Sequence, residues 1–203
     1  ATVRGPSSPV AEIGKPHVLA WFRRRTQDRL TAVDLYGAVV AEARRPIIFE
    51  RFGVQDTPEG RAGLIILAAF PVLERLKAGS PRARRVARLI TEAYVTDVDD
   101  CLREMGVGDM AVPRKVKRAA QALGERCNAY ARAAGGAVPL PALAAELAST
   151  IPGLEAAPAA ANALARFALA TIKRLEALQE DMILAGHLPF TPLSADDLVE
   201  TPS

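Results

Sequence analysis

The side chains that could carry out catalysis are few and far apart. The chain has two histidines, His17 and His187, both near its ends, and two cysteines, Cys101 and Cys127. It has no E-x-x-H, H-E-x-x-H or C-x-x-C pattern and no glycine-rich phosphate loop of the G-x-x-x-x-G-K or G-x-G-x-x-G type. A nucleophile needs a positioned base, and a metal needs converging ligands. We therefore expect no enzymatic activity, no metal and no cofactor.

One carboxylate stands out because of its position. Asp97 lies eleven residues after Val86, about three helical turns, and so falls within an apolar stripe. A carboxylate buried there without a partner would be costly. We expect it to pair with an arginine, with Arg61 the first choice and Arg44 or Arg45 the alternatives, or with backbone donors.

Other acidic residues nearby have a simpler explanation. Asp99 and Arg103 are four residues apart, which is the spacing of a surface ion pair on a helix. With Asp97, Asp100 and Glu104, the carboxylates spread around the helix rather than converge. This distribution argues against acid–base catalysis.

Four cations crowd the predicted start of the next helix: Arg114, Lys115, Lys117 and Arg118. The helix macrodipole disfavours positive charge at this end. An acidic partner would explain the cluster, and so would a solvated face. A helical adaptor that binds nucleic acid or the ribosome through these residues is the alternative function.

A short segment near the N-terminus combines aromatic and basic residues. Trp21 and Phe22 are followed directly by Arg23, Arg24 and Arg25. Aromatic rings at the headgroup level with arginines on anionic phosphates would make a shallow membrane or partner contact. The alternative is that Trp21 caps the fold and the arginines are solvated.

Two amphipathic helices on either side of a glycine turn must position most of these residues. Apolar residues recur with a helical period from Val86 to Met105 and again from Val116 to Tyr130. Gly106 suits the positive φ of a helix end. We predict a helical hairpin over about 82–134, with both cysteines as reduced thiols in the core.

The remaining elements are also predicted to be helical. The run from Ala62 to Leu76 is apolar on nearly every side, so we expect a central buried helix over about 58–78, capped by Thr57 and kinked at Pro71. A long helix is expected over about 159–185. The predicted fold is all-α, a single compact bundle of six to eight helices.

Composition and charge limit the remaining possibilities. Half of the 203 residues are hydrophobic, and the net charge is only +3, which is too small to argue for DNA binding. The longest apolar run, of about a dozen residues, is too short to span a membrane. We expect residues 1–17 to be disordered or poorly docked, 18–186 to form the domain, and 187–203 to form a tail, disordered at its end.

Two blocks of sequence resemble a known family. LREMGVGDMAVPRKVKR (Leu102–Arg118) resembles the signature of the ubiquinol–cytochrome c chaperone family. LYGAVVAEARRPIIFERFGVQDTPEGR (Leu35–Arg61) agrees with it in order and spacing. The resemblance is strongest over residues 30–135 and fades beyond Gly136.

This resemblance implies a function that the composition does not. Family members assist assembly of the cytochrome bc1 complex and handle newly made cytochrome b, with a small helical co-chaperone and near the ribosome. The implied location is the cytoplasmic face of a bacterial inner membrane, or the matrix side in mitochondria. The residues implied to matter are Arg44, Asp56, Arg61, Asp97, Asp99, Arg103, Gly106, Gly108 and Asp109.

Overall fold

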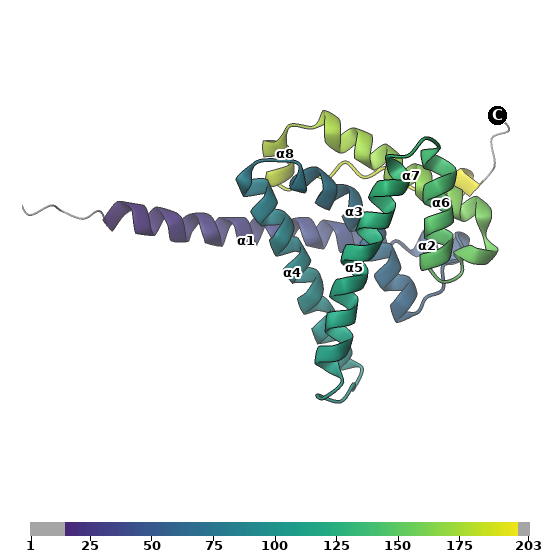
Figure 1. The fold of residues 1–203 in the computed structure, drawn as a ribbon, viewed down its shortest axis with the longest axis horizontal. Helices are drawn as coiled ribbons and strands as arrows, with labels where there is room; N and C mark the ends of the chain where they lie inside the picture. Colours follow the sequence, from purple (N-terminus) through teal and green to yellow (C-terminus); the bar gives the residue numbers. More distant parts are fainter. Residues whose placement is uncertain (1–14, 199–203) are drawn as a thin grey trace, which may run out of the picture.

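The computed structural model describes residues 15–198, and side chains from Arg25 onward. The described part forms eight α-helices and two short 3-10 helices and contains no strand (Figure 1). The predicted all-α fold is therefore confirmed. The elements are α1 (Lys15–Ala43), α2 (Pro46–Arg51), α3 (Pro58–Lys77), α4 (Pro81–Glu104), α5 (Val112–Ala134), α6 (Pro139–Thr150), η1 (Leu154–Ala156), α7 (Pro158–Ala177), α8 (Glu180–Leu184) and η2 (Ala195–Leu198).

Helix α3 lies at the centre and contacts α1, α4, α5 and α7. Every residue from Gly63 to Leu73 is buried, as expected for a helix that is apolar all round. The helix starts where predicted, because the Thr57 hydroxyl accepts a hydrogen bond of 3.1 Å from the backbone N–H of Gly60. It continues through Pro71 to Lys77 as one helix.

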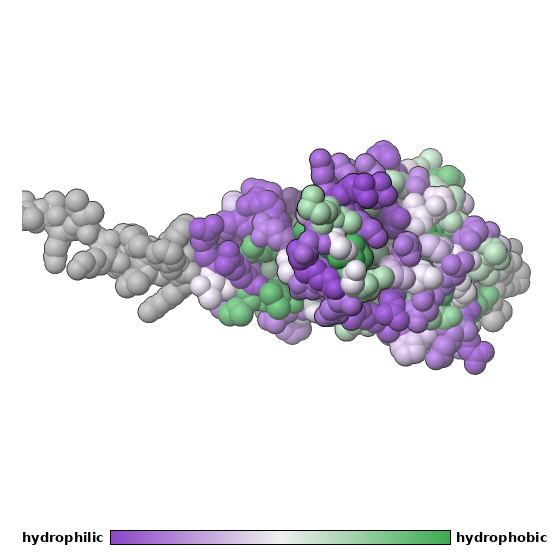
Figure 2. All heavy atoms as spheres, turned by 90° about the horizontal axis from the view of Figure 1, so that it is seen from below, coloured by the Kyte–Doolittle hydropathy of each residue, from purple (hydrophilic) through white to green (hydrophobic). Residues whose placement is uncertain are grey.

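Helices α4 and α5 form the predicted hairpin, whose tip projects away from the body (Figure 1). The α4 helix ends in a Schellman motif with Gly106 at φ +74°. The N–H of Gly106 bonds to the carbonyl of Arg103 at 2.9 Å, and that of Val107 to the carbonyl of Leu102 at 3.0 Å. Seen from below, hydrophobic surface lies among hydrophilic residues where the hairpin points at the viewer (Figure 2).

Helix α1 starts within the segment 1–17 that we expected to be disordered or poorly docked. It begins at Lys15, so the expected domain boundary at residue 18 falls inside a helix. Residues 1–14, most of the segment expected to be disordered, lie outside the described residues. The side chains of Trp21, Phe22, Arg23 and Arg24 lie outside them too, whereas Arg25 is described and exposed.

The long helix predicted over 159–185 is wrong, because the chain breaks at Leu178 and Gln179, whose backbones are extended. The break brings Glu180 to the start of α4. There its carboxylate accepts hydrogen bonds from the Ser80 hydroxyl and, at 2.9 Å, from the Ser80 N–H. The end of α7 thus coincides with a tertiary contact at the N-terminus of α4. Helical periodicity in the sequence cannot reveal such a contact.

The C-terminal segment packs on the domain up to the last described residues. Leu193 is buried, and its carbonyl accepts a hydrogen bond of 3.2 Å from Arg45. The ring of Phe190 stacks on Phe167 with centroids 6.1 Å apart. Residues 199–203 lie outside the described part. Across residues 15–198, no helix has both the length and the apolar character that crossing a bilayer requires.

Candidate functional site

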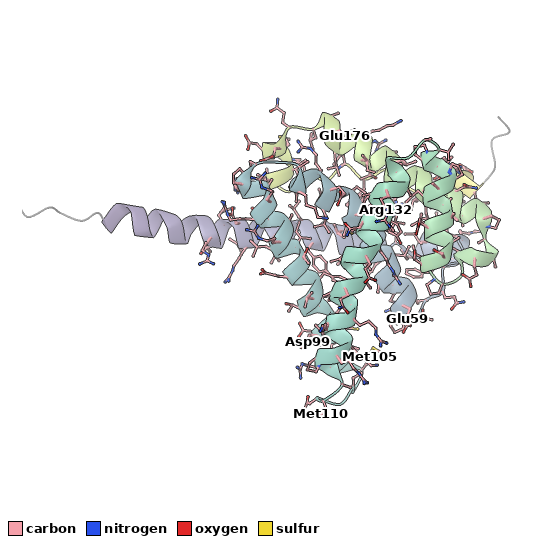
Figure 3. The ribbon with its side chains drawn as sticks, viewed as in Figure 1. Glu59, Asp99, Met105, Met110, Arg132 and Glu176 are labelled. Carbon is pink, nitrogen blue, oxygen red and sulfur yellow. The ribbon has the colours of Figure 1, made fainter. Side chains whose placement is uncertain are left out.

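A groove opens between the start of α3 and the α4–α5 hairpin, with the end of α1 at its edge. Its volume is about 500 Å³. Figure 3 shows Met105 towards the tip of the hairpin and Glu59 on the first turn of α3; both line the groove. We call it the hairpin groove and define it by its main lining residues: Arg44, Asp56, Arg61, Ile65, Tyr94, Asp97, Val98, Cys101, Leu102, Met105 and Lys115.

The apolar wall of the groove is the outer half of the α4 stripe. The inner half, from Val86 to Tyr94, is buried against the body. Farther out, Cys101 is exposed and Met105 is 56% exposed, because the hairpin extends past the helices that cover its base. The prediction that Cys101 is a core thiol is therefore wrong. The same period that buries Tyr94 places Cys101 and Met105 along the groove.

Asp97 lies in the groove and is half-buried, and its partner is not an arginine. The hydroxyl of Tyr36 on α1 donates a hydrogen bond of 2.8 Å to the Asp97 carboxylate. Burial and this hydrogen bond raise the pKa of Tyr36 well above its usual range, so the hydroxyl stays protonated. The predicted pairing with Arg61 is wrong, because Arg61 points to a different carboxylate.

Arg61 forms a two-pronged ion pair with Asp56, just ahead of α3. The Arg61 Nε lies 2.6 Å from one carboxylate oxygen and Nη2 lies 3.1 Å from the other. The guanidinium lowers the pKa of Asp56. Together with Arg44, these residues also line a neighbouring cavity of about 450 Å³. In the described structure Arg44 forms no ion pair with a carboxylate, so its charge is available at this edge.

A second polar cluster lies at the hairpin turn, outside the groove. The Arg103 guanidinium bonds to Asp99 at 2.6 Å and to Asp109 at 3.2 Å, which ties the end of α4 to the turn. The predicted surface pair of Asp99 and Arg103 is confirmed. Gly106 has the predicted positive φ, whereas Gly108 does not, and a side chain at Gly108 would point into open space.

The four cations at the start of α5 are exposed, and none pairs with a described carboxylate. The helix has no side-chain cap and no acidic residue in its first turn. Lys115 reaches the hairpin groove, while Arg114, Lys117 and Arg118 do not line it. The structure therefore divides this basic cluster into one groove residue and three surface residues.

Histidine and cysteine side chains are common bases and nucleophiles of catalytic sites. Among its described lining residues, Cys101 is the one thiol and none is a histidine. The other cysteine, Cys127, is buried, which raises the pKa of its thiol to about 12. His187 is exposed near the C-terminal end of the described chain. Among residues 15–198, no group of histidine, cysteine or acidic side chains gathers as metal ligands would.

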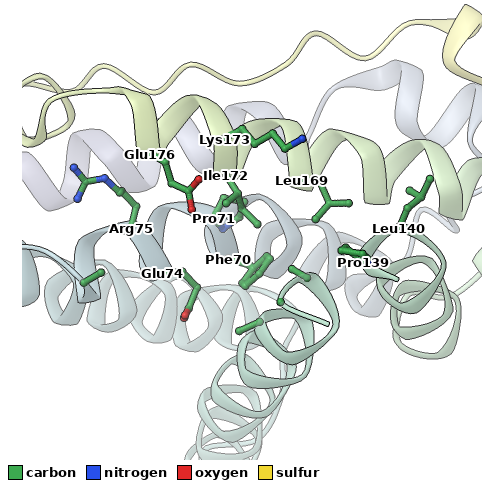
Figure 4. Close-up of a pocket in the computed structure, with 14 residues that line it drawn as sticks. Phe70, Pro71, Glu74, Arg75, Pro139, Leu140, Leu169, Ile172, Lys173 and Glu176 are labelled. Carbon is green, nitrogen blue, oxygen red and sulfur yellow. The ribbon is translucent and has the colours of Figure 1, made fainter. Parts of the chain in front are cut away.

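A larger cavity of about 630 Å³ lies between α3, α5, α6 and α7 (Figure 4). Phe70, Leu140 and Ile172 supply apolar surface, and Glu74 and Lys173 stand at its margin. None of the residues predicted from the sequence lines this cavity. The hairpin groove, by contrast, is lined by both resembling blocks, which are far apart in the chain.

Sequence reasoning missed three residues that shape the groove. Tyr36 donates the hydrogen bond to Asp97, and Tyr94 lines the inner end of the groove although most of its side chain is buried. Gly60 lets the first turn of α3 approach the preceding loop, because a Cβ there would collide with the carbonyl oxygen of Gln55. Tyr36 and Gly60 both lie within the first resembling block. Its LYG motif contains Tyr36 and its GR motif contains Gly60, so these motifs could have indicated both residues.

The comparisons with known proteins identify the family and a protein of similar fold. Residues 50–190 match the family model described as Ubiquinol-cytochrome C chaperone, so the match extends well beyond Gly136, where the resemblance was expected to fade. The chain is similar to the crystal structure of the Cbp3 homolog from Brucella abortus, with 33% sequence identity and a TM-score of 0.74. That alignment covers 88% of this chain and 98% of the other. No individually curated protein matches the chain. This chain belongs to the ubiquinol–cytochrome c chaperone family.

Proposed function

We propose that this protein is a non-enzymatic assembly chaperone that binds newly made cytochrome b and assists assembly of the cytochrome bc1 complex. The family match supports the role in assembly. Cytochrome b as the client follows from the family resemblance of the two sequence blocks. Among the described residues, neither a histidine base nor a set of metal ligands surrounds the groove, which supports action by binding.

The observation that carries the proposal is that the two blocks meet at one groove. Arg44, Asp56 and Arg61 come from the first block, and Leu102, Met105 and Lys115 come from the second. Residues more than forty positions apart in sequence thus line one surface. We infer that this shared surface is where the client binds.

The groove suits an apolar segment flanked by charge. Val98, Leu102 and Met105 offer apolar contact, and methionine adapts to irregular partners because its side chain is unbranched and flexible. Arg44 and Lys115 at the edge would bind acidic or carbonyl groups of the client. Covering an apolar client segment lowers the exposed apolar area that drives aggregation before assembly.

The proposed location is the cytoplasmic face of the inner membrane, or the matrix side in a mitochondrial setting. A peripheral position fits a client that is a membrane protein. The proposed contacts are the Trp21–Arg25 segment with the membrane or a partner, and Arg114, Lys117 and Arg118 with a small helical co-chaperone or the ribosome. No DNA partner is expected.

The test is to place a photocrosslinking side chain at Met105 and capture newly made cytochrome b. A matched position is Met182, which is also exposed but lies on α8, away from the groove. Crosslinks to cytochrome b from position 105 and not from position 182 would support the groove. Equal yields from both would contradict it. Deletion of the protein should selectively remove the absorbance of bc1 cytochromes, and unchanged spectra would contradict the assembly role.

A second function keeps some support from the cations at the start of α5. Arg114, Lys115, Lys117 and Arg118 have no ion-pair partner in the described structure, as expected of a nucleic-acid-binding surface. Under this alternative the protein is a helical adaptor that binds RNA. Its binding would weaken steeply with salt, whereas the grip on an apolar client would not.

A further inference from the structure

A second charged surface lies where α1 crosses the first half of α4, and it shares no lining residue with the hairpin groove. Asp28 on α1 is only 3% exposed. Its carboxylate accepts hydrogen bonds from Arg82 Nε at 2.9 Å and from Arg85 Nε at 3.2 Å. A buried carboxylate requires such partners, and the pairing fixes both guanidinium groups beside α1.

These contacts border a small cavity of about 260 Å³. We call it the arginine cavity; its lining residues are Arg25, Asp28, Arg29, Arg85, Arg88, Leu89 and Glu92. Four arginines thus face two carboxylates, so the cavity carries an excess of positive charge. In the described structure Arg29 and Arg88 form no ion pair with either carboxylate. Such a hollow lined by one sign of charge concentrates anions.

Two apolar side chains are exposed on α1, the helix that supplies Arg29 to the arginine cavity. Leu30 is 54% exposed and Val33 is 60% exposed, which is unusual for large apolar residues beside so much charge. Val33 lies one helical turn after Arg29, so the two share a face of α1. Figure 2 shows hydrophobic surface next to strongly hydrophilic surface at the end of the molecule from which the grey N-terminal segment extends.

We propose that this α1–α4 surface docks on an anionic bilayer, with the phosphate of a phospholipid headgroup in the arginine cavity. Guanidinium groups bind phosphate oxygens through two parallel hydrogen bonds. Leu30 and Val33 then contact the boundary between headgroups and acyl chains. The inference rests on the proposed membrane location but does not depend on the client or on the hairpin groove.

Three observations favour a lipid over RNA as the partner. Within the described part of the chain, no aromatic ring lines the arginine cavity, so it lacks the stacking platform on which single-stranded bases bind. Exposed Leu30 and Val33 add affinity for a bilayer interface but none for a phosphate backbone. The cavity is also a single hollow rather than a track along which successive phosphates could lie.

Vesicle flotation of the full chain tests the proposal. The vesicles contain phosphatidylcholine alone or phosphatidylcholine mixed with phosphatidylglycerol, which supplies the negative charge. The wild-type protein should float only with the anionic vesicles. The double variant Arg29→Gln with Arg88→Gln should weaken this partition by about thirtyfold, because each arginine near the surface contributes about fivefold to sixfold.

The matched control is Lys117→Gln with Arg118→Gln, which removes the same charge from the hairpin. It should leave the partition nearly unchanged; an equal loss in both variants would mean that net charge alone drives binding and would overturn the proposal. Leu30→Ser with Val33→Ser should weaken binding to anionic vesicles at high salt. Unchanged binding would contradict the proposed contact of these two side chains with the bilayer. Circular dichroism checks that each variant is folded.

RNA binding is tested on the same proteins. If the Arg29 and Arg88 double variant loses binding to a single-stranded RNA while the wild type ignores anionic vesicles, the surface contacts RNA and the lipid proposal is wrong. Cytochrome b crosslinking from Met105 reports separately on the proposed function. If the wild-type protein does not float with anionic vesicles but still crosslinks to cytochrome b, only the membrane proposal is wrong. If it floats but does not crosslink, the client groove is wrong.

Discussion

The Tyr36 hydroxyl on α1 donates a hydrogen bond of 2.8 Å to Asp97 on α4, and this contact joins two helices across 61 positions of sequence. Tyr36→Phe removes the donor and leaves a half-buried carboxylate without it, which should cost about 1–3 kcal/mol of unfolding free energy. Chemical denaturation measures the loss. In a double-mutant cycle, Tyr36→Phe and Asp97→Ala should be strongly coupled, whereas Arg61→Ala and Asp97→Ala should be additive. Coupling in the second cycle would show that Arg61 does pair with Asp97.

The ion pair between Arg61 and Asp56 is exposed, so its replacement separates binding from stability. We expect Arg61→Ala to leave the melting temperature nearly unchanged and to reduce crosslinking of cytochrome b at the hairpin groove. Lys173→Ala, at the margin of the other cavity, is the control and should leave crosslinking intact. If only Lys173→Ala reduced the crosslinking, the client would bind at the cavity between α3 and α7 instead.

Gly106 and Gly108 are predicted to differ although they are two residues apart. Gly106→Ala places a Cβ at φ +74° and should destabilise the protein by about 1 kcal/mol. Gly108→Ala should have little effect, because its Cβ meets open space and its φ is not positive. Thermal denaturation of the two variants compares them. Equal destabilisation would show that the turn needs glycine for another reason.

Acid should weaken the contact between Glu180 and the start of α4. Hydrogen bonds from the Ser80 hydroxyl and N–H lower the pKa of Glu180 below its usual value of 4.5. A lowered folded-state pKa stabilises the fold above about pH 4.5, and this contribution disappears as the pH falls through the folded-state pKa. Melting temperatures from neutral pH to about pH 3 should therefore fall more steeply for the wild type than for Glu180→Gln. Parallel curves would exclude this contribution.

The two cysteines should react very differently with a thiol reagent. Cys101 is exposed on the groove wall and should be modified in the native protein. Cys127 is buried with a thiol pKa of about 12, so it should react only after unfolding. Mass spectrometry should find one modified thiol, and none in Cys101→Ser. A bound apolar client peptide should slow the reaction at Cys101; an unchanged rate would argue against occupancy of the groove.

The positions of several helix ends could be predicted because the signals are local. Thr57 caps α3 with its own side chain, and Gly106 ends α4 with its own backbone angle, so each is readable within a few residues of sequence. The hairpin follows from two apolar stripes and a short turn. Boundaries that depend on distant partners were not readable, as the break before Glu180 shows.

The candidate site was only partly predictable. The first resembling block points to Arg44, Asp56 and Arg61 from sequence alone, and all three line the groove. The partner of Asp97 was wrongly predicted, because helical periodicity gives the direction of a side chain but not what lies opposite it. The arginine cavity was not predicted at all. The PRARRVAR segment starting at Pro81 forms one side of it only because Asp28, on another helix, binds Arg82 and Arg85.

The sequence by itself determined the helical class, the buried central helix, the hairpin and the family, because these depend on local periodicity, capping and motifs. The tertiary structure alone decided which part of each apolar stripe is covered. Tyr94 is buried and Met105 is exposed on the same stripe of α4, since the helices that pack on the hairpin end before its tip. Burial is a property of neighbours in space, and those neighbours come from distant parts of the chain.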